Sequence, residues 1–175
     1  MGLSDRRYSQ HARRSLIRAR RLAREFYHPA VETDHVVLGM LRTESSIGYR
    51  VLSEFRIDQI RAEGIVRGLY SYQYNQRTDL PPFSRNLQSV LLYASDEAYW
   101  LGSHYIGTEH ILLGLVRSGT GQLSNLLLQL QISSHQVRHS IRHVLSEGAY
   151  ETNLEAVRRS ARLSELSRRV LNGAA

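Results

Sequence analysis

Two short motifs hold the side chains best suited to chemistry. Each joins a hydroxyl, a carboxylate and an imidazole in three consecutive residues: Thr33-Asp34-His35 and Thr108-Glu109-His110. The threonine is predicted to be the N-cap of a helix, and the acid to lie at the positive end of its dipole. With one histidine in each motif there is no local pair of ligands, so a tetrahedral zinc site is not expected. The motifs can serve the structure alone or bind a ligand, and both interpretations stay open.

The rest of the sequence offers little for catalysis. It contains no cysteine and no lysine, so all 23 permanently charged basic residues are arginine. Thiol catalysis, thiolate metal sites, Schiff-base chemistry and a phosphate-binding P-loop are thereby excluded. No Gly-x-Ser-x-Gly elbow accompanies the serines and histidines that a hydrolase would need. We therefore expect no enzyme, no cofactor and no metal.

The two motifs belong to a repeat that covers most of the chain. Shifting the sequence by 75 residues aligns 8–70 with 83–145 without a gap. The identities cluster in the pattern Thr-x-His-x-x-Leu-Gly-x-x-Arg, which begins at Thr33 and again at Thr108. A cluster of identities at one constant offset indicates two copies of a structural unit. We expect repeat 1 at 8–70, a linker at 71–82 and repeat 2 at 83–146.

Hydrophobic spacing predicts four helices in each copy. Apolar residues step by three and four along 12–26 and along 87–101, which is typical of long amphipathic helices. Ser9 and Ser84 stand where an N-cap hydroxyl would begin each of them. Shorter helices are expected near 46–55, 58–69, 120–130 and 134–146.

The helix that follows each motif is apolar on nearly every side, which places it in the centre of a bundle. Gly39 and Gly114 interrupt these two helices and predict the close approach of a neighbouring helix. Leu38 and Leu113 are expected to be equivalent buried residues beside them.

The C-terminal part of the chain predicts one more amphipathic helix, at 152–171. Residues 163–174 resemble 8–19 at an offset of 155, as if a third copy opened here. Either a longer protein has been cut at this point, or the helix packs elsewhere. The expected fold class is therefore all-α: an eight-helix, pseudo-twofold double repeat with an extra C-terminal helix, in one compact domain.

A longer signature surrounds the second motif. Residues 101–115 read Leu-Gly-Ser-His-Tyr-Ile-Gly-Thr-Glu-His-Ile-Leu-Leu-Gly-Leu. They closely resemble the Clp N-terminal domain pattern L-G-x-x-Y-I-G-T-E-H-[IL]-L-L-G-L, whereas the first copy lacks the Ile-Gly pair before its threonine. The resemblance covers about 8–146 and implies an eight-helix domain of the ClpC/ClpA kind, here without the ATPase modules. In that family the domain binds substrates and adaptors and delivers them to ATPase rings.

The resemblance also implies a ligand for the two motifs. In the ClpC branch, the acid of each motif is associated with recognising phosphorylated arginine on substrates. Carried over residue by residue, peptide and phosphoarginine binding would fall to Thr108 and Glu109 and, with a shorter acid, to Thr33 and Asp34. A carboxylate suits a guanidinium, because its two oxygens match the fork of N–H donors.

Arginine-rich segments leave a second class of function open. Residues 6–24 hold eight arginines, and 158–169 hold five more. A solvated basic face is the simplest interpretation. The alternative is a helical domain that binds nucleic acid or another polyanion through phosphate contacts, although no helix-turn-helix or RNA-binding signature accompanies the arginines.

The sequence favours a protein-binding or peptide-binding adaptor, or a substrate-recognition module, associated with Clp-type proteolysis or quality control. Its expected partners are protein substrates or adaptors, with a Clp ATPase or protease acting in trans as one candidate. Nucleic acid is the less favoured partner. A membrane partner and a secretory signal are not expected, because the apolar runs are short and broken by charges. The expected location is the cytoplasm.

Overall fold

The computed structural model of the chain describes residues 7–70, 79–129 and 131–147. Two units are distinguished, Met1–Ile141 and Arg142–Ala175, and both motifs lie in the first. Most of the expected linker, 71–78, lies outside the described residues. So does the expected C-terminal helix at 152–171.

The first helix of each copy begins as the sequence predicts. Helix α1 spans Gln10–Glu25 and helix α5 spans Arg85–Trp100. The hydroxyls of Ser9 and Ser84 each accept the backbone N–H three residues further on, at 3.2 Å in both copies. Each hydroxyl satisfies a donor that the first turn of a helix otherwise leaves unpaired, so both predicted N-caps are confirmed.

The remaining elements complete an all-α fold. Helices α2 to α7 include Thr33–Leu41 (α2), Ile47–Glu54 (α3), Gln59–Arg67 (α4), Thr108–Ser118 (α6) and Gln122–Gln129 (α7). A short 3₁₀ helix, η1 (Gly68–Tyr70), follows α4, and residues 134–147 are also helical. The eight α-helices within the described residues confirm the predicted all-α class. None of the described helices is long and apolar enough to cross a membrane.

Two isolated backbone bridges join one copy to the other. Tyr8 pairs with Ile106, and Val31 pairs with Phe83. The second pair is the first shifted by 75 residues with the copies exchanged, which is what a pseudo-twofold axis between the copies requires. Backbone hydrogen bonds of 2.7–3.0 Å accompany both bridges. The segment before the first helix of each copy is thus bonded to the other copy.

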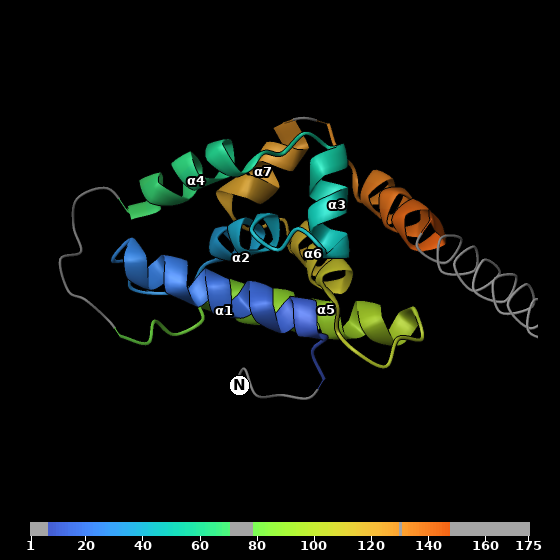
Figure 1. Cartoon of the computed structure of the whole chain (residues 1–175), viewed down its shortest axis with the longest axis horizontal. Coiled ribbons are helices and arrows are strands. Elements are labelled where there is room, and N and C mark those ends of the chain that lie inside the picture. The colour runs from blue at the N-terminus through green and yellow to red at the C-terminus, as the bar shows by residue number, and fades with distance from the viewer. Residues whose placement is uncertain (1–6, 71–78, 130, 148–175) are drawn as a thin grey trace, which may run out of the picture. The chain divides into compact units, whose positions relative to one another are not determined.

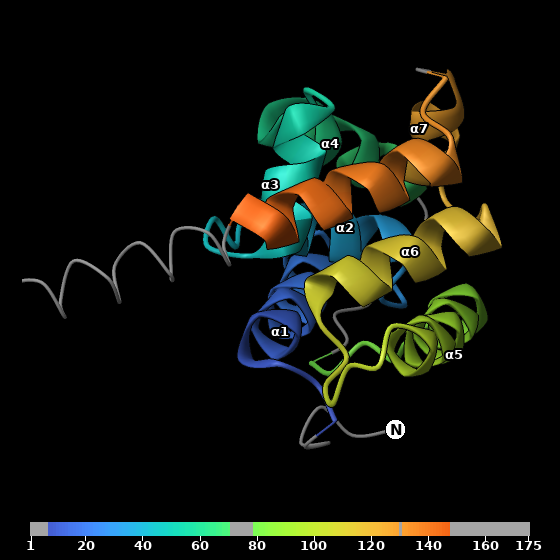
Figure 2. The ribbon, with the colours of Figure 1, turned by 90° about the vertical axis from the view of Figure 1, so that its right-hand side faces the viewer.

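The helices of the first unit form three layers. Helices α1 and α5 lie in one outer layer, α2 and α6 lie in the middle, and α3, α4 and α7 lie on the other side (Figures 1 and 2). All nine residues of α2 are buried, and Leu38 and Leu113 are 0% and 3% exposed. The prediction that these leucines occupy equivalent buried positions in the middle layer is confirmed.

Two glycines let the layers approach closely. Helix α1 packs on α2 at Gly39, and α5 packs on α6 at Gly114. A Cβ atom added to Gly39 would lie 3.2 Å from the backbone nitrogen of Ala19, and one added to Gly114 would lie 3.0 Å from that of Ala94. Backbone carbonyl oxygens lie closer still, so each neighbouring helix leaves no room for a side chain. The predicted reason for these glycines is confirmed.

Candidate functional site

The predicted N-caps at Thr33 and Thr108 are wrong by one residue. Glu32 is the N-cap of α2, and Gly107 is the N-cap of α6. Both threonines are the first residues inside their helices, and the hydroxyl of each bonds to a backbone group of the other copy. The acids that follow are in the first turn as predicted, where the helix dipole favours negative charge.

The motif histidines do the capping instead. His35 Nδ1 accepts the backbone N–H of Glu32 at 3.0 Å, and His110 Nδ1 accepts that of Gly107 at 2.9 Å. A glutamate or glutamine usually makes this contact three residues after the cap. Each histidine is therefore a structural part of its helix start, bonded and buried.

These imidazoles are held in their neutral form. Burial and the neighbouring His28 lower the pKa of His35 to about 3, and burial also lowers the pKa of His28 and of His110. His35 Nε2 lies 2.8 Å from His28 Nδ1. Because Nδ1 of His35 is already an acceptor, its Nε2 carries the hydrogen and donates it to His28. A second proton on either ring would break this arrangement.

In the first repeat (8–70, copy 1), the acid of the motif bonds to the second repeat (83–146, copy 2). The Asp34 carboxylate accepts the backbone N–H of Leu123 at 2.6 Å and that of Gln122 at 3.2 Å. These N–H groups open α7, so Asp34 caps a helix 88 residues away in the chain. The Thr33 hydroxyl donates to the carbonyl of Thr120 at 3.3 Å. We call this meeting of two helix starts the α2–α7 junction.

The Asp34 side chain is enclosed at the α2–α7 junction. The residue is only 2% exposed, and burial raises the pKa of its carboxyl above the usual value. Gly121 lies directly against it with φ of 97°, and a Cβ added there would come within 2.9 Å of a carboxylate oxygen. Two backbone donors and this close packing leave Asp34 little capacity for a further ligand.

In copy 2 the equivalent helix starts meet differently. Thr108 Oγ1 accepts the backbone N–H of Gly48 at 3.0 Å, in the first turn of α3. The next N–H of α3, that of Tyr49, is bonded to the Ser46 hydroxyl at 3.1 Å. We call this meeting the α6–α3 junction. Helix α3 is therefore capped by hydroxyls, where α7 is capped by a carboxylate.

The Glu109 carboxylate is left available at the α6–α3 junction. Its polar contacts are with the Thr108 hydroxyl and His110 Nδ1, both at 3.5 Å, and its side chain is 14% exposed. Within the described part of the chain, no backbone N–H donates to it. The carboxylate folds back over Gly107, where any Cβ would overlap it. Copy 1 has Glu32 at the position of Gly107, so it cannot build the same arrangement.

This arrangement suits one kind of chemistry, the binding of a group that carries both charges. A partly exposed carboxylate can pair with a guanidinium through two parallel hydrogen bonds. The starts of α6 and α3 meet beside it, and the N-termini of helices attract anions such as phosphate. Among the described residues, no group of three or more potential metal ligands is present. The junction is therefore suited to recognition by charge and hydrogen bonding.

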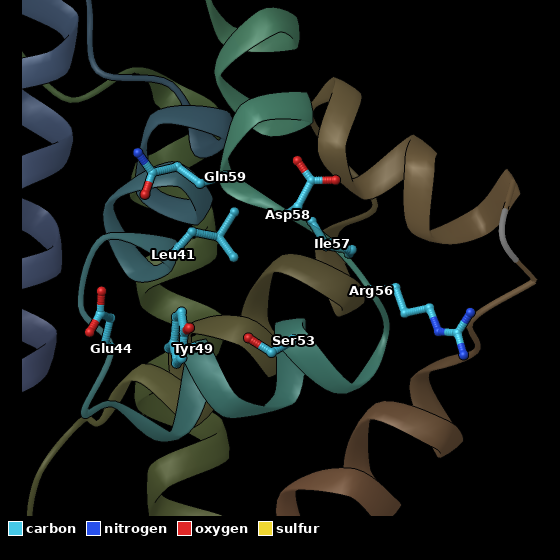
Figure 3. A pocket seen from close by; sticks show the side chains of 8 residues that line it. All are labelled: Leu41, Glu44, Tyr49, Ser53, Arg56, Ile57, Asp58 and Gln59. Carbon is cyan, nitrogen blue, oxygen red and sulfur yellow. The ribbon is translucent and has the colours of Figure 1, made fainter.

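A pocket of about 450 Å³ lies elsewhere on copy 1, between the end of α2, α3 and the start of α4 (Figure 3). Buried Leu41 and Ile57 line it together with exposed Glu44 and Asp58, and the Asp58 carboxylate caps α4 through the N–H of Arg61 at 2.7 Å. None of the four motif residues proposed to bind ligands lines this pocket.

The sequence did not reveal the partners of the motifs. The donors from Gly48, Gln122 and Leu123 are backbone groups on the other copy, and backbone groups leave no trace in residue type. The His28 partner of His35 lies in the loop before α2, so the helical pattern around His35 does not point to it. A signal for the junctions existed only in the repeat, because the 75-residue shift relates Gly48 to Leu123.

The two interlocked four-helix copies, with an acid in the first turn of each central helix, are the architecture of the N-terminal domains of Clp-type ATPases. The chain belongs to the Clp repeat (R) N-terminal domain family, whose sequence profile matches residues 7–130 and 82–175. The resemblance inferred from the second motif is thereby confirmed.

Curated relatives are much longer than this chain. The chaperone protein ClpB of Oceanobacillus iheyensis is 28% identical over 169 residues, which is 97% of this chain and 20% of that protein. The negative regulator of genetic competence ClpC/MecB of Bacillus subtilis is 29% identical over 150 residues, or 86% of this chain and 18% of that protein. The chain thus spans about a fifth of the length of these relatives.

Solved structures share the fold. The N-domain of ClpV from Vibrio cholerae superposes with a TM-score of 0.68 at 19% identity, covering 83% of this chain and 90% of that domain. A ClpV N-domain in complex with VipB peptide gives 0.66 at 19% identity, covering 80% and 88%. The N-terminal domain of ClpD from Arabidopsis thaliana gives 0.62 at 22% identity, covering 80% and 95%.

Proposed function

We propose that this domain is a non-catalytic recognition module that binds polypeptides at the α6–α3 junction. The observation that carries the proposal is the Glu109 carboxylate, which is partly exposed, lies where two helix starts meet, and accepts no backbone N–H in the described structure. A carboxylate in this state is ready to bind a cationic group. Thr108 holds the junction together through Gly48 and positions the acid.

The family supports a role in protein quality control. A related ClpV N-domain has been solved with a bound VipB peptide, and the curated relatives include ClpB and ClpC proteins. We propose the same kind of role for this domain, which binds protein substrates or adaptors in the cytoplasm for a Clp ATPase or protease. That ATPase or protease either is a separate protein or belongs to a longer chain that includes this domain. The domain itself has no lysine for a P-loop, so we expect a malachite-green assay to detect no ATP hydrolysis.

The ligand that suits the α6–α3 junction is phosphorylated arginine on a peptide. Its guanidinium matches the Glu109 carboxylate, and its phosphoryl group matches the positive ends of the helices that meet there. Thr33 and Asp34 form a second, weaker site in this proposal, because Asp34 already accepts two backbone N–H groups from α7. The two sites therefore differ in affinity.

Calorimetric titration of matched peptides tests the proposal. The peptides carry phosphoarginine, arginine or phosphoserine at one central position, and we expect only the first to bind. Glu109→Gln keeps the size of the side chain and removes its charge, so affinity should fall at least about tenfold, or about 1.4 kcal/mol.

The matched control is Glu44→Gln. It removes one negative charge from an exposed position in the other copy, and it should leave the affinity within about twofold of the parent value. Unchanged binding by the Glu109 variant would refute the proposed site. Equal losses in both variants would show that only the net charge matters.

A further inference from the structure

Helix α1 carries a concentration of positive charge that nothing in the described structure neutralises. It contains one acid, Glu25, and six arginines: Arg13, Arg14, Arg18, Arg20, Arg21 and Arg24. Arg18 donates to the Thr43 hydroxyl at 2.8 Å, and Arg20 lies 4.7 Å from the centre of the Phe83 ring. Across residues 7–70, 79–129 and 131–147, none of the six forms an ion pair with a carboxylate.

The most accessible of these side chains form one line along the helix. Arg14, Arg21 and Arg24 are exposed, and Ile17 between them is 39% exposed. Steps of three, four and three residues keep side chains on one face of a helix. We call these four residues the arginine ridge. At its C-terminal end lies a hollow of about 360 Å³, lined by Arg21, Arg24, Glu25 and Tyr27.

The fold does not require arginine at these positions. Helix α5 is the equivalent helix of copy 2, and the 75-residue shift places Ser89, Leu92, Asp96 and Tyr99 at the four ridge positions. The same helix in the same layer is thus built with no positive charge on that line. Arg21 and Arg24 lie three residues apart on one face, where like charges slightly destabilise a helix, so this pair adds nothing to the stability of α1. A binding role accounts for the presence of the ridge.

We propose that the arginine ridge docks an acidic segment of a partner protein. Carboxylates of the segment pair with the guanidinium groups, an apolar side chain covers Ile17, and another side chain enters the hollow beside Tyr27. A nucleic-acid backbone fits less well, because its phosphates gain nothing from covering the exposed apolar side chain of Ile17. This surface is a second docking site on the recognition module, and it shares no residue with the α6–α3 junction.

Fluorescence anisotropy with a synthetic probe tests the ridge. The probe is a labelled peptide of three heptads rich in glutamate and leucine, compared with a twin that carries glutamine in place of every glutamate. The variant is Arg14→Gln with Arg21→Gln, which removes two exposed charges and keeps good helix formers. We expect the acidic probe to bind, the neutral twin not to bind, and the variant to weaken the acidic probe at least about tenfold.

The control removes two exposed arginines elsewhere, Arg61→Gln with Arg85→Gln on α4 and α5, and should change affinity less than about twofold. Equal weakening by both double variants would reduce the effect to net charge and overturn the proposal. Failure of the acidic probe to bind, or equal binding of its twin, would do the same.

A labelled oligothymidine separates the two classes of partner. The oligonucleotide could bind more tightly than the acidic peptide and lose its binding in the Arg14→Gln, Arg21→Gln variant. The ridge would then be a nucleic-acid surface, and the proposal would be wrong. Glu109→Gln should leave binding of the acidic peptide unchanged, because the ridge does not use that acid. The ridge proposal can therefore fail without affecting the phosphoarginine proposal, and the reverse also holds.

Discussion

At the scale of single residues, the acids of the two motifs do different work. Asp34 accepts two backbone N–H groups from α7 and is buried, whereas Glu109 is partly exposed and accepts no backbone N–H from the residues that the structure describes. The side chain of Glu109 is one methylene group longer than that of Asp34. Gly107 has no side chain, which leaves room for the Glu109 carboxylate to fold back over it. The first acid serves the fold, and the second is available for binding.

Asp34→Asn should therefore destabilise the protein, while Glu109→Gln should not. An asparagine presents one oxygen where the aspartate presents two, so a buried backbone donor of α7 loses its partner at a cost of about 1–3 kcal/mol. The Glu109 variant loses no backbone bond and should stay within about 0.5 kcal/mol. Urea denaturation measures both values. Equal free energies of unfolding for the two variants would contradict this division of roles.

The buried histidines predict how stability depends on pH. The folded-state pKa of His35 is lowered to about 3, whereas an unfolded histidine takes up a proton near pH 6.5. Below pH 6.5 the unfolded state binds more protons than the folded state, so the free energy of unfolding falls as the pH falls. For His35 alone the loss by pH 5 is about 2 kcal/mol.

His35→Gln tests this origin, because a glutamine can accept the N–H of Glu32 and does not titrate. The free energy of unfolding should differ less between pH 7.5 and pH 5 in the variant than in the parent protein, as measured by chemical denaturation. His104→Gln, an exposed histidine, is the control and should retain the full difference. A parent protein equally stable at both pH values would refute the account.

At the scale of helices, the sequence predicted what local pattern determines. Apolar spacing located the helices, and Ser9 and Ser84 begin theirs as expected, because a cap is a contact between near neighbours in the chain. The caps at Thr33 and Thr108 were misplaced by one residue, because those hydroxyls bond across to the other copy. Contacts between copies depend on tertiary arrangement, which periodicity does not encode.

The glycines of the middle layer provide a test at this scale. Gly39→Ala and Gly114→Ala should each destabilise by about 1–3 kcal/mol, because the new methyl group meets the backbone of α1 or α5. Gly64→Ala on α4 is the matched control, since nothing lies within 4 Å of the added Cβ atom. There the better helix propensity of alanine should stabilise by about 0.5–1 kcal/mol. Thermal unfolding ranks the stabilities of the three variants. If the change in stability had the same sign at all three positions, close packing would be excluded as the cause.

At the scale of the whole first unit, the two copies are interdependent. Each copy supplies a bridge, a junction and a middle helix to the other, so the unit should unfold in one step. Leu38→Ala and Leu113→Ala should each cost about 2–5 kcal/mol, because both leucines are buried in the middle layer. Arg14→Ala on the exposed face should cost under about 0.5 kcal/mol. Chemical denaturation followed by circular dichroism checks these values, and a neutral leucine variant would show that the copies are not structural equivalents.

We propose that the α6–α3 junction binds a phosphoarginine peptide. The most direct test is an NMR titration of the isotope-labelled chain with that peptide, following every backbone amide. The largest shifts should occur at the amides of Gly48, Gly107 and Glu109, with smaller shifts at the α2–α7 junction around Asp34 and Leu123. Shifts centred on Asp34 or on the arginine ridge, or no shifts with the peptide in excess, would contradict the claim.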